Sequence, residues 1–74
     1  MTIDSLKQGQ SAVIKGFDGD LQTIKDLQEL GFLTNSTVCM ISRGFFRGPM
    51  AFLVNGATVA LRRHEASVVL IHEN

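Results

Sequence analysis

One stretch near the middle of the chain, from Asp20 to Ile41, constrains the fold most strongly. Its first half carries apolar residues at helical spacing, with polar residues on the opposite half of the helical wheel. Asp20 is a suitable N-cap, and Gly31 stands where a helix ends by entering the left-handed region that glycine adopts easily. The pattern predicts a surface helix over residues 21–30 with one wide buried face. That face is formed by Leu21, Ile24, Leu27 and Leu30.

The residues after Gly31 predict how the chain leaves this helix. In a Schellman ending the residue that follows the glycine packs back on the helix, which pairs Phe32 with Leu27. A turn over Thr34–Ser36 follows, because Asn35 tolerates a positive φ. The sequence therefore predicts a unit of helix, sharp stop, turn and strand.

Short segments of alternating apolar residues predict five strands around this unit. Asn55-Gly56 is a strong hairpin signal, because a type I′ turn needs a positive φ at both positions. A single 3₁₀ turn is expected over Arg63–Ala66. Five short strands close most readily into a small barrel, which also removes the sheet edges, and we expect residues 1–74 to form one such domain, with the helix at one end. The predicted strands are Ser11–Phe17, Val38–Ile41, Met50–Val54, Thr58–Arg62 and Val68–Ile71.

Composition excludes several classes of protein. The chain has 74 residues, of which 45% are hydrophobic, so it can form a core and is too apolar for a disordered segment. The single cysteine excludes an internal disulfide. The chain contains neither a run of ~20 apolar residues nor a charged-then-apolar leader, so we expect a cytoplasmic protein.

Several fixed spacings match one known family. The most telling is the Leu27-x-x-Leu30-Gly31-Phe32 element, followed after a turn by a strand. On this set of spacings the chain resembles the FeoA family, small bacterial proteins of the ferrous iron transport system. Two positions depart from the family pattern: Thr34-Asn35 replaces a usual Pro-Gly, and Phe45 replaces a usual proline. The further matching residues are Gly9, Ala12, Ile14, Val38, Met40, Gly48-Pro49, Val59-Ala60-Leu61-Arg62, Glu65-Ala66, Val69 and Ile71.

The resemblance implies a mainly β, SH3-like five-stranded barrel and a function in ferrous iron uptake. It implies a non-enzymatic accessory protein that docks on the cytosolic part of FeoB, the membrane iron transporter with a G-protein domain, and reaches the membrane only through that partner. The family often carries a label for transition metal ion binding. The same fold is similar to the C-terminal domain of iron-dependent repressors of the diphtheria toxin repressor type.

Residues capable of catalysis or metal binding are few and scattered. Cys39 lies within a predicted strand and is interpreted as a small apolar residue. His64 lies beside Arg62 and Arg63, which would oppose a cation, and His72 lies near the chain end. We therefore expect no catalytic residue, no cofactor and no metal site.

Binding to another protein is the preferred interpretation. Phe45 and Phe46 are adjacent aromatic residues on a loop, where exposed apolar groups usually mark an interaction surface. The alternative is that the loop folds over one end of the barrel and hides both rings. Leu53 should point outward from its strand. The predicted docking face comprises Arg43, Phe45, Phe46, Arg47 and Leu53.

Two other functions remain open. A small barrel can bind single-stranded nucleic acid by stacking bases on Phe45 and Phe46 and binding phosphates with arginines. A net charge of zero and the lack of a Lys/Arg stripe count against this function. A metal-responsive domain, like that of the repressors, would need ligands that the sequence does not offer. The sequence leaves the oligomeric state open.

Overall fold

The computed structural model of the chain describes residues 1–72. Each predicted strand is present within one residue of its expected bounds, and the predicted helix ends one residue early, with Leu30 as its C-cap. In chain order the elements are η1 (Ile3–Ser5), β1 (Ser11–Phe17), α1 (Leu21–Glu29), β2 (Thr37–Ser42), β3 (Met50–Val54), β4 (Ala57–Leu61), α2 (Arg63–Ala66) and β5 (Val69–Ile71). None of these helices is long and apolar enough to cross a membrane.

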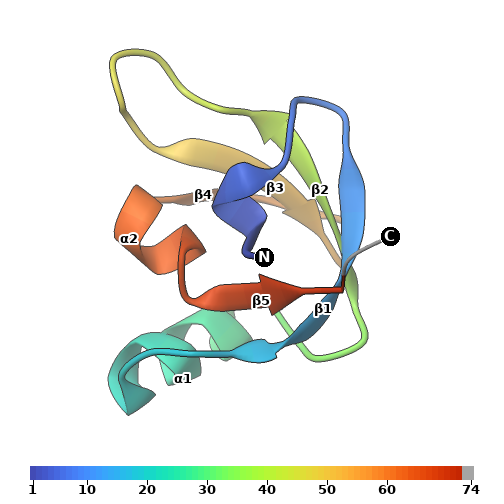
Figure 1. Cartoon of the computed structure of the whole chain (residues 1–74), viewed down its shortest axis with the longest axis vertical. Coiled ribbons are helices and arrows are strands. Elements are labelled where there is room, and N and C mark those ends of the chain that lie inside the picture. Colours follow the sequence, from blue (N-terminus) through green and yellow to red (C-terminus); the bar gives the residue numbers. More distant parts are fainter. Residues whose placement is uncertain (73–74) are drawn as a thin grey trace.

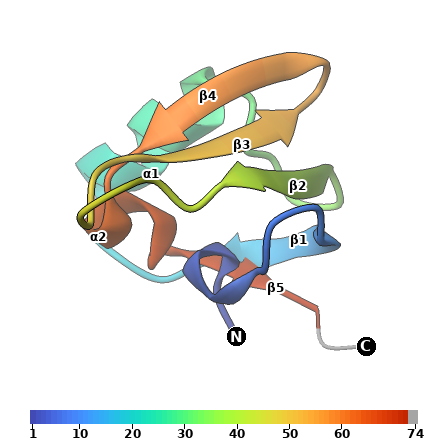
Figure 2. The same ribbon diagram turned by 90° about the horizontal axis from the view of Figure 1, so that it is seen from above.

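The strands form one antiparallel sheet in the order β4-β3-β2-β1-β5. The prediction of a closed barrel is wrong in this respect, because β4 and β5 remain the two edges of the sheet. Figure 2 shows the five strands side by side from β4 to β5, and Figure 1 shows α2 in the connection between these two edges. In chain order α2 lies between β4 and β5, and its Ala66 is fully buried, so these two strands are joined by a helical turn packed into the core and not by a tight turn that would pair them.

The end of α1 has the predicted Schellman geometry. Gly31 has a φ of 109°, and its amide donates to the carbonyl oxygen of Gln28 at 3.0 Å. The amide of Phe32 donates to the carbonyl oxygen of Leu27 at 3.0 Å, and both of these side chains lie in the core. The helix therefore stops within one residue and returns the chain to the sheet.

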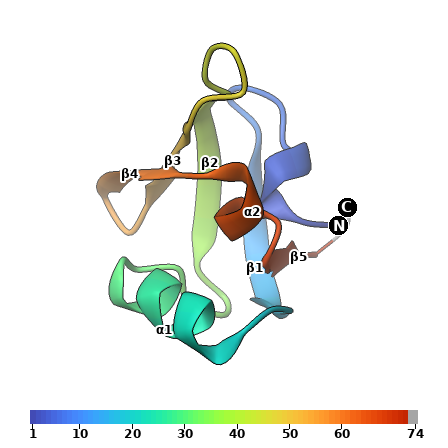
Figure 3. The ribbon, with the colours of Figure 1, turned by 90° about the vertical axis from the view of Figure 1, so that its left-hand side faces the viewer.

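The prediction of a wide buried face on α1 is wrong at both of its flanks. Leu27 is buried and Ile24 packs against the core, but Leu21 is 79% exposed and Leu30 is 46% exposed. At 100° per residue these two flanking leucines lie about 180° apart around the helix axis. The core contacts only the middle of this arc, so each flanking side chain points sideways into solvent. Figure 3 shows α1 at one end of the sheet, where only one side of the helix faces the strands.

The core lies on the inner face of the curved sheet. Phe32 and Phe52 meet edge to face, with ring centroids 6.3 Å apart and an interplanar angle of 84°. Ile3 and Leu6 from the N-terminal segment are buried, and Val59 is half-buried against the core. The remaining buried core residues are Ile14, Leu27, Val38, Met40, Met50, Val54, Leu61, Ala66, Val68, Val69 and Ile71.

The predicted turns are confirmed. Asn55 and Gly56 have φ values of 49° and 78°, as a type I′ hairpin turn requires, and Asn35 has a φ of 74°. The helical turn expected before β5 is α2, which combines i→i−3 and i→i−4 bonds. Its amide donors at Glu65 and Ala66 both bond to the carbonyl oxygen of Arg62.

Candidate protein-docking site

The loop between β2 and β3, residues 43–49, has a narrow neck. Gly44 has a φ of 78°, and a Cβ atom at this position would lie 2.4 Å from the carbonyl oxygen of Pro49. The same atom would lie 2.9 Å from the carbonyl oxygen of Gly48. The two limbs of the loop therefore run against each other, which requires glycine at position 44 and pushes the rest of the loop away from the sheet.

The tip of this loop is a tight turn made of unfavourable residue types. The amide of Gly48 donates to the carbonyl oxygen of Phe45 at 2.8 Å, and Phe46 and Arg47 have φ values of 51° and 62°. This is a type I′ turn, which Asn-Gly usually forms. Each residue with a Cβ atom in the left-handed region destabilises the fold by about 1–2 kcal/mol. The tip therefore stores backbone strain while it projects two aromatic rings.

Both rings at the tip are solvent-exposed. Phe45 is 86% exposed and Phe46 is 101% exposed. The alternative in which the loop folds over the barrel end and hides both rings does not occur. Two neighbouring phenylalanines in water are an exposed apolar surface with no structural role in this chain's core.

Arg43 has a different position from the one expected of a docking residue. Its guanidinium Nη1 donates to the carbonyl oxygen of Asp4 at 2.9 Å and to that of Leu6. Its own carbonyl oxygen accepts a hydrogen bond from Arg63 Nη2 at 3.2 Å. Arg43 therefore ties the base of the loop to the N-terminal segment and to α2, and it holds the loop in place.

A basic pocket of about 360 Å³ lies beside the loop. Arg47 lines it together with Arg62, Arg63 and His64, and none of the lining residues carries a carboxylate. The guanidinium of Arg63 is fixed by the carbonyl oxygen of Arg43 and by Met50 Sδ at 3.6 Å, and its buried Nε atom has no hydrogen-bond partner among residues 1–72. The pocket is therefore a concentration of positive charge next to two exposed rings.

Sequence reasoning missed this basic pocket, although a signal for it was present. Arg47 and Arg62 are distant in sequence, so no Lys/Arg stripe is visible. The two-residue turn at Asn55-Gly56 fixes the register of the hairpin, in which Met50 lies opposite Leu61. Extending that register by one residue brings the end of the loop beside Arg62, which brings the arginines of the two segments together.

Leu53 does not belong to the loop surface. It points outward from β3, is 39% exposed and pairs opposite Cys39 on β2. Leu53 lies three residues along β3 from Met50, so Leu53 is about 10 Å from the base of the loop. The structure therefore brings Phe45, Phe46 and Arg47 together at the tip and places Leu53 on the outer face of the sheet.

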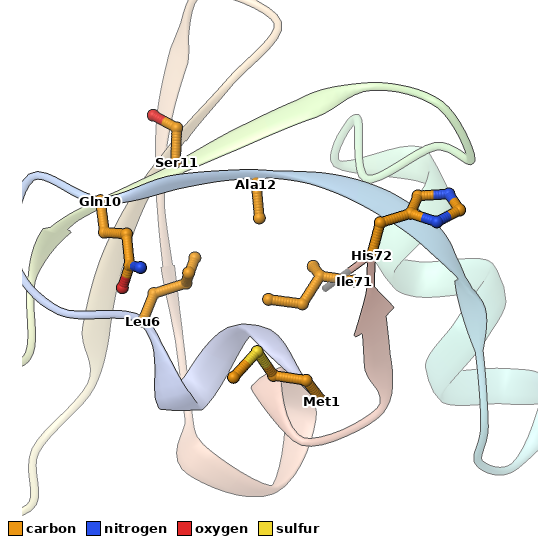
Figure 4. A pocket seen from close by; sticks show the side chains of 7 residues that line it. All are labelled: Met1, Leu6, Gln10, Ser11, Ala12, Ile71 and His72. Atoms are coloured by element: carbon orange, nitrogen blue, oxygen red, sulfur yellow. The ribbon is translucent and has the colours of Figure 1, made fainter. Parts of the chain in front are cut away.

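A second pocket of about 380 Å³ lies beside η1, on the opposite side of β1 from β2. Figure 4 shows Met1 and Leu6 pointing into it, whereas the ring of His72 points away from Met1. The amide oxygen of Gln10 accepts a hydrogen bond from the amide of Lys7 at 3.0 Å, which orients this side chain beside the pocket. Of the described residues that line this pocket, only His72 has an ionisable side chain.

The residues considered for metal chemistry remain apart. Cys39 is half-buried on β2, while His64 lies on α2 and His72 follows β5. Among residues 1–72 no group of three or more His, Cys, Asp and Glu side chains is placed to hold a metal ion.

The fold is shared with several solved structures. The Stenotrophomonas maltophilia FeoA crystal structure, a zinc complex of a prokaryotic SH3 domain protein, is 29% identical, with a TM-score of 0.84 over 97% of this chain and 89% of that chain. The solution structure of FeoA from Chlorobium tepidum is 22% identical, with a TM-score of 0.88 over 97% of this chain and 69% of that chain.

A repressor has the same fold within a longer chain. A manganese-dependent transcriptional repressor is 18% identical, with a TM-score of 0.86 over 96% of this chain. This chain spans only 40% of the length of that repressor, so the similarity shows a shared fold. Among curated protein sequences, no significant match is found.

The match to a family model covers nearly the whole chain. The model of the FeoA domain matches residues 1–73. This match agrees with the SH3-like architecture and with the Leu27-x-x-Leu30-Gly31-Phe32 element that ends α1. The chain therefore belongs to the FeoA family, whose members are accessory or transport-related proteins of ferrous iron transport.

Proposed function

We propose that this protein is a non-enzymatic accessory protein of ferrous iron uptake that docks on the cytosolic part of a FeoB-type transporter and modulates it. The observation that carries the proposal is the strained loop tip, which exposes Phe45 and Phe46 beside Arg47. Membership of the FeoA family supports a role in ferrous iron uptake, and the loop tip is the surface that we propose contacts the partner. The protein would act in the cytoplasm and reach the membrane only through this partner.

The composition of the tip supports docking on a protein. Aromatic and arginine side chains dominate the binding energy of protein interfaces, because they bury a large area at a small cost in conformational entropy. Backbone strain of this kind persists at binding and switch sites because the surrounding structure holds it. Here the Gly44 neck and the Arg43 hydrogen bonds hold the tip in place before any partner arrives. A preformed tip loses less entropy on binding than a flexible loop.

The test is a calorimetric titration with the purified cytosolic domain of the transporter from the same organism. Phe45→Ser/Phe46→Ser should weaken binding at least about tenfold, because it removes the two largest exposed apolar groups. The matched control is Leu21→Ser/Leu30→Ser, which removes two exposed leucines from α1 and should change the affinity less than about twofold. Equal affinities for the two double variants, or no binding by the wild-type protein, would contradict the proposal.

A second candidate function, binding of single-stranded nucleic acid, has one observation in its favour. The basic pocket lies beside the two rings, an arrangement that can hold phosphates and stack bases. A titration with a random oligonucleotide at two salt concentrations tests it, since phosphate contacts make affinity fall steeply with salt. Measurable affinity with a steep salt dependence would favour this function over docking on a protein.

A further inference from the structure

The two edges of the sheet differ in whether another segment of the chain covers them. The edge at β5 is covered by the N-terminal residues: Thr2 forms a bridge with Leu70, and the amide of Ile71 donates to the carbonyl oxygen of Met1 at 3.0 Å. The edge at β4 has no backbone partner from residues 1–72 on its outer side. One edge is therefore closed by the chain itself, and the other is open.

The hydrogen-bonding groups on the open edge follow from the register of the hairpin. The tight turn makes Val54 and Ala57 a hydrogen-bonded pair, and bonded and non-bonded pairs alternate from there. The amide and carbonyl groups of Thr58 and Ala60 consequently point away from β3. The next donor in this series, the amide of Arg62, is already bound by Glu65 Oε1 at 2.8 Å. The open edge thus offers two donors and two acceptors at the spacing of an extended chain.

The open edge also lacks the features that usually prevent strand addition. Proteins protect exposed edges with charges, proline, bulges or a covering segment. β4 contains no charged residue and no proline. Its pairing with β3 has no shift in register, unlike the β2–β3 and β1–β5 pairs. Ala57, Thr58 and Ala60 are all exposed. This edge is therefore suited to receive a further strand.

The basic pocket identifies the chemistry of that strand. Arg62 directly follows β4, and with Arg47 and His64 it lines the pocket at the C-terminal end of the edge. An added antiparallel strand would begin at the pocket and run toward the Asn55-Gly56 turn. Its first residues should be acidic, because charge complementarity at the pocket fixes both direction and register.

We propose that β4 accepts an extended acidic segment of the docking partner as a sixth strand, an inference that rests on the proposed function. Aspartate or glutamate side chains at the start of the segment bind in the basic pocket, and the uncharged residues that follow pair with Thr58 and Ala60. A second copy of this chain is a poorer occupant. Residues 30–64, which include all of β4, contain no acidic residue for the pocket of the partner copy.

The probe for this proposal is a synthetic eight-residue peptide with three aspartates followed by alternating valine and threonine, observed by fluorescence anisotropy. Two peptide controls separate charge from strand pairing. One replaces the aspartates by lysines, and the other carries N-methyl groups on the alternate amides that would face β4. Both controls should bind at least about tenfold more weakly than the probe, since each removes one of the two interactions.

Two variants of the protein test the same contacts from the other side. Ala60→Pro removes an outward donor and leaves the β3–β4 ladder intact, because proline is tolerated where the amide faces away from the sheet. Arg62→Glu reverses the charge at the pocket. Each should weaken binding of the acidic peptide at least about tenfold, while Lys25→Glu, an equal charge change on α1, should change it less than about twofold.

The outcomes also distinguish this inference from the proposed function. The inference is overturned if the N-methylated peptide and Ala60→Pro bind as well as their parents, or if sedimentation shows a wild-type dimer that Ala60→Pro dissociates. If Phe45→Ser/Phe46→Ser abolishes binding to the transporter domain while Ala60→Pro does not weaken it, the proposed function stands without the strand addition. If the acidic peptide binds as expected and the transporter domain does not, the strand site stands and the transporter is not the partner.

Discussion

The side-chain amide of Asn55 donates a hydrogen bond to the carbonyl oxygen of Gly31 at 2.8 Å. Gly31 ends α1 and Asn55 begins the turn between β3 and β4, so the bond joins the helix stop to the hairpin. Both residues have a positive φ, of 109° and 49° respectively. Two left-handed positions far apart in sequence are thus held against each other, and each can be tested separately.

Gly31 variants should lose stability in a defined order. A residue with a Cβ atom in the left-handed region costs about 1–2 kcal/mol, so Gly31→Ala should lower the free energy of unfolding by at least ~1 kcal/mol. Gly31→Val should cost more, because its branched side chain is stiff, and Gly31→Asn should cost least, because Asn enters this region most readily. Urea unfolding measures the order. Equal midpoints for the three variants would contradict the left-handed helix stop.

Asn55 variants separate the hydrogen bond from the turn conformation. Asn55→Gly keeps a residue suited to the positive φ and removes the bond to Gly31, so the lost bond should cost about 0.5–1.5 kcal/mol, in addition to the cost of glycine's greater freedom in the unfolded chain. Asn55→Ala removes the bond and also strains the turn, so it should cost about 1 kcal/mol more. Urea unfolding of both variants gives the two contributions. An Asn55→Gly variant as stable as wild type would show that the bond contributes nothing in solution.

Asp20 should make stability depend on pH in the acid range. Hydrogen bonds from the hydroxyl and the amide of Thr23 hold the pKa of Asp20 below its ordinary value of 3.8. A group with a lowered pKa in the folded state stabilises the fold above its unfolded pKa, and this stabilisation is lost as the pH falls through the folded value. Asp20→Asn, which can still cap the helix, should remove this dependence and leave stability at pH 7 nearly unchanged. Melting curves between pH 2 and pH 7, a range set around the ordinary aspartate value, provide the comparison. A wild type and an Asp20→Asn variant with parallel curves would rule out the contribution.

Relief of strain at the loop tip should stabilise the protein. Arg47 has a φ of 62°, so Arg47→Gly should raise the free energy of unfolding by about 1 kcal/mol even though it removes a large side chain. Gly48→Ala is the matched change and should lower the free energy of unfolding, because a Cβ atom there would lie 2.9 Å from the carbonyl oxygen of Phe45. Thermal unfolding shows whether each of the two variants is more or less stable than the wild type. A destabilised Arg47→Gly variant would mean that the tip is not strained.

Local sequence signals were sufficient for most of the fold. The cap at Asp20, the stop at Gly31 and the Asn55-Gly56 turn each act through their immediate neighbours, so they could be predicted from residue type and spacing. The open sheet could not be predicted in this way, because it depends on how α2, the connection between β4 and β5, buries Ala66 in the core, and no local rule specifies that packing. The exposure of Leu21 and Leu30 likewise depends on how much of the helix the sheet covers, and hydrophobic periodicity does not report that.

The candidate site was only partly accessible from the sequence. The two adjacent phenylalanines on a loop gave the correct expectation of exposed rings. The hydrogen bonds of Arg43 to Asp4 and Leu6 depend on how the N-terminal segment crosses the sheet, which residue spacing does not specify. The basic pocket needed the register of the hairpin, which brings Arg47 and Arg62 to the same place.

Photo-crosslinking in the native cell tests the central claim of docking through the loop tip most directly. A benzophenone amino acid replaces Phe46, and in a separate variant it replaces Leu21, which is also exposed but lies on α1. After irradiation, the Phe46 variant should form a covalent adduct that contains the FeoB-type transporter, and the Leu21 variant should not. Adducts with the transporter from both positions, or from neither, would contradict docking through this loop.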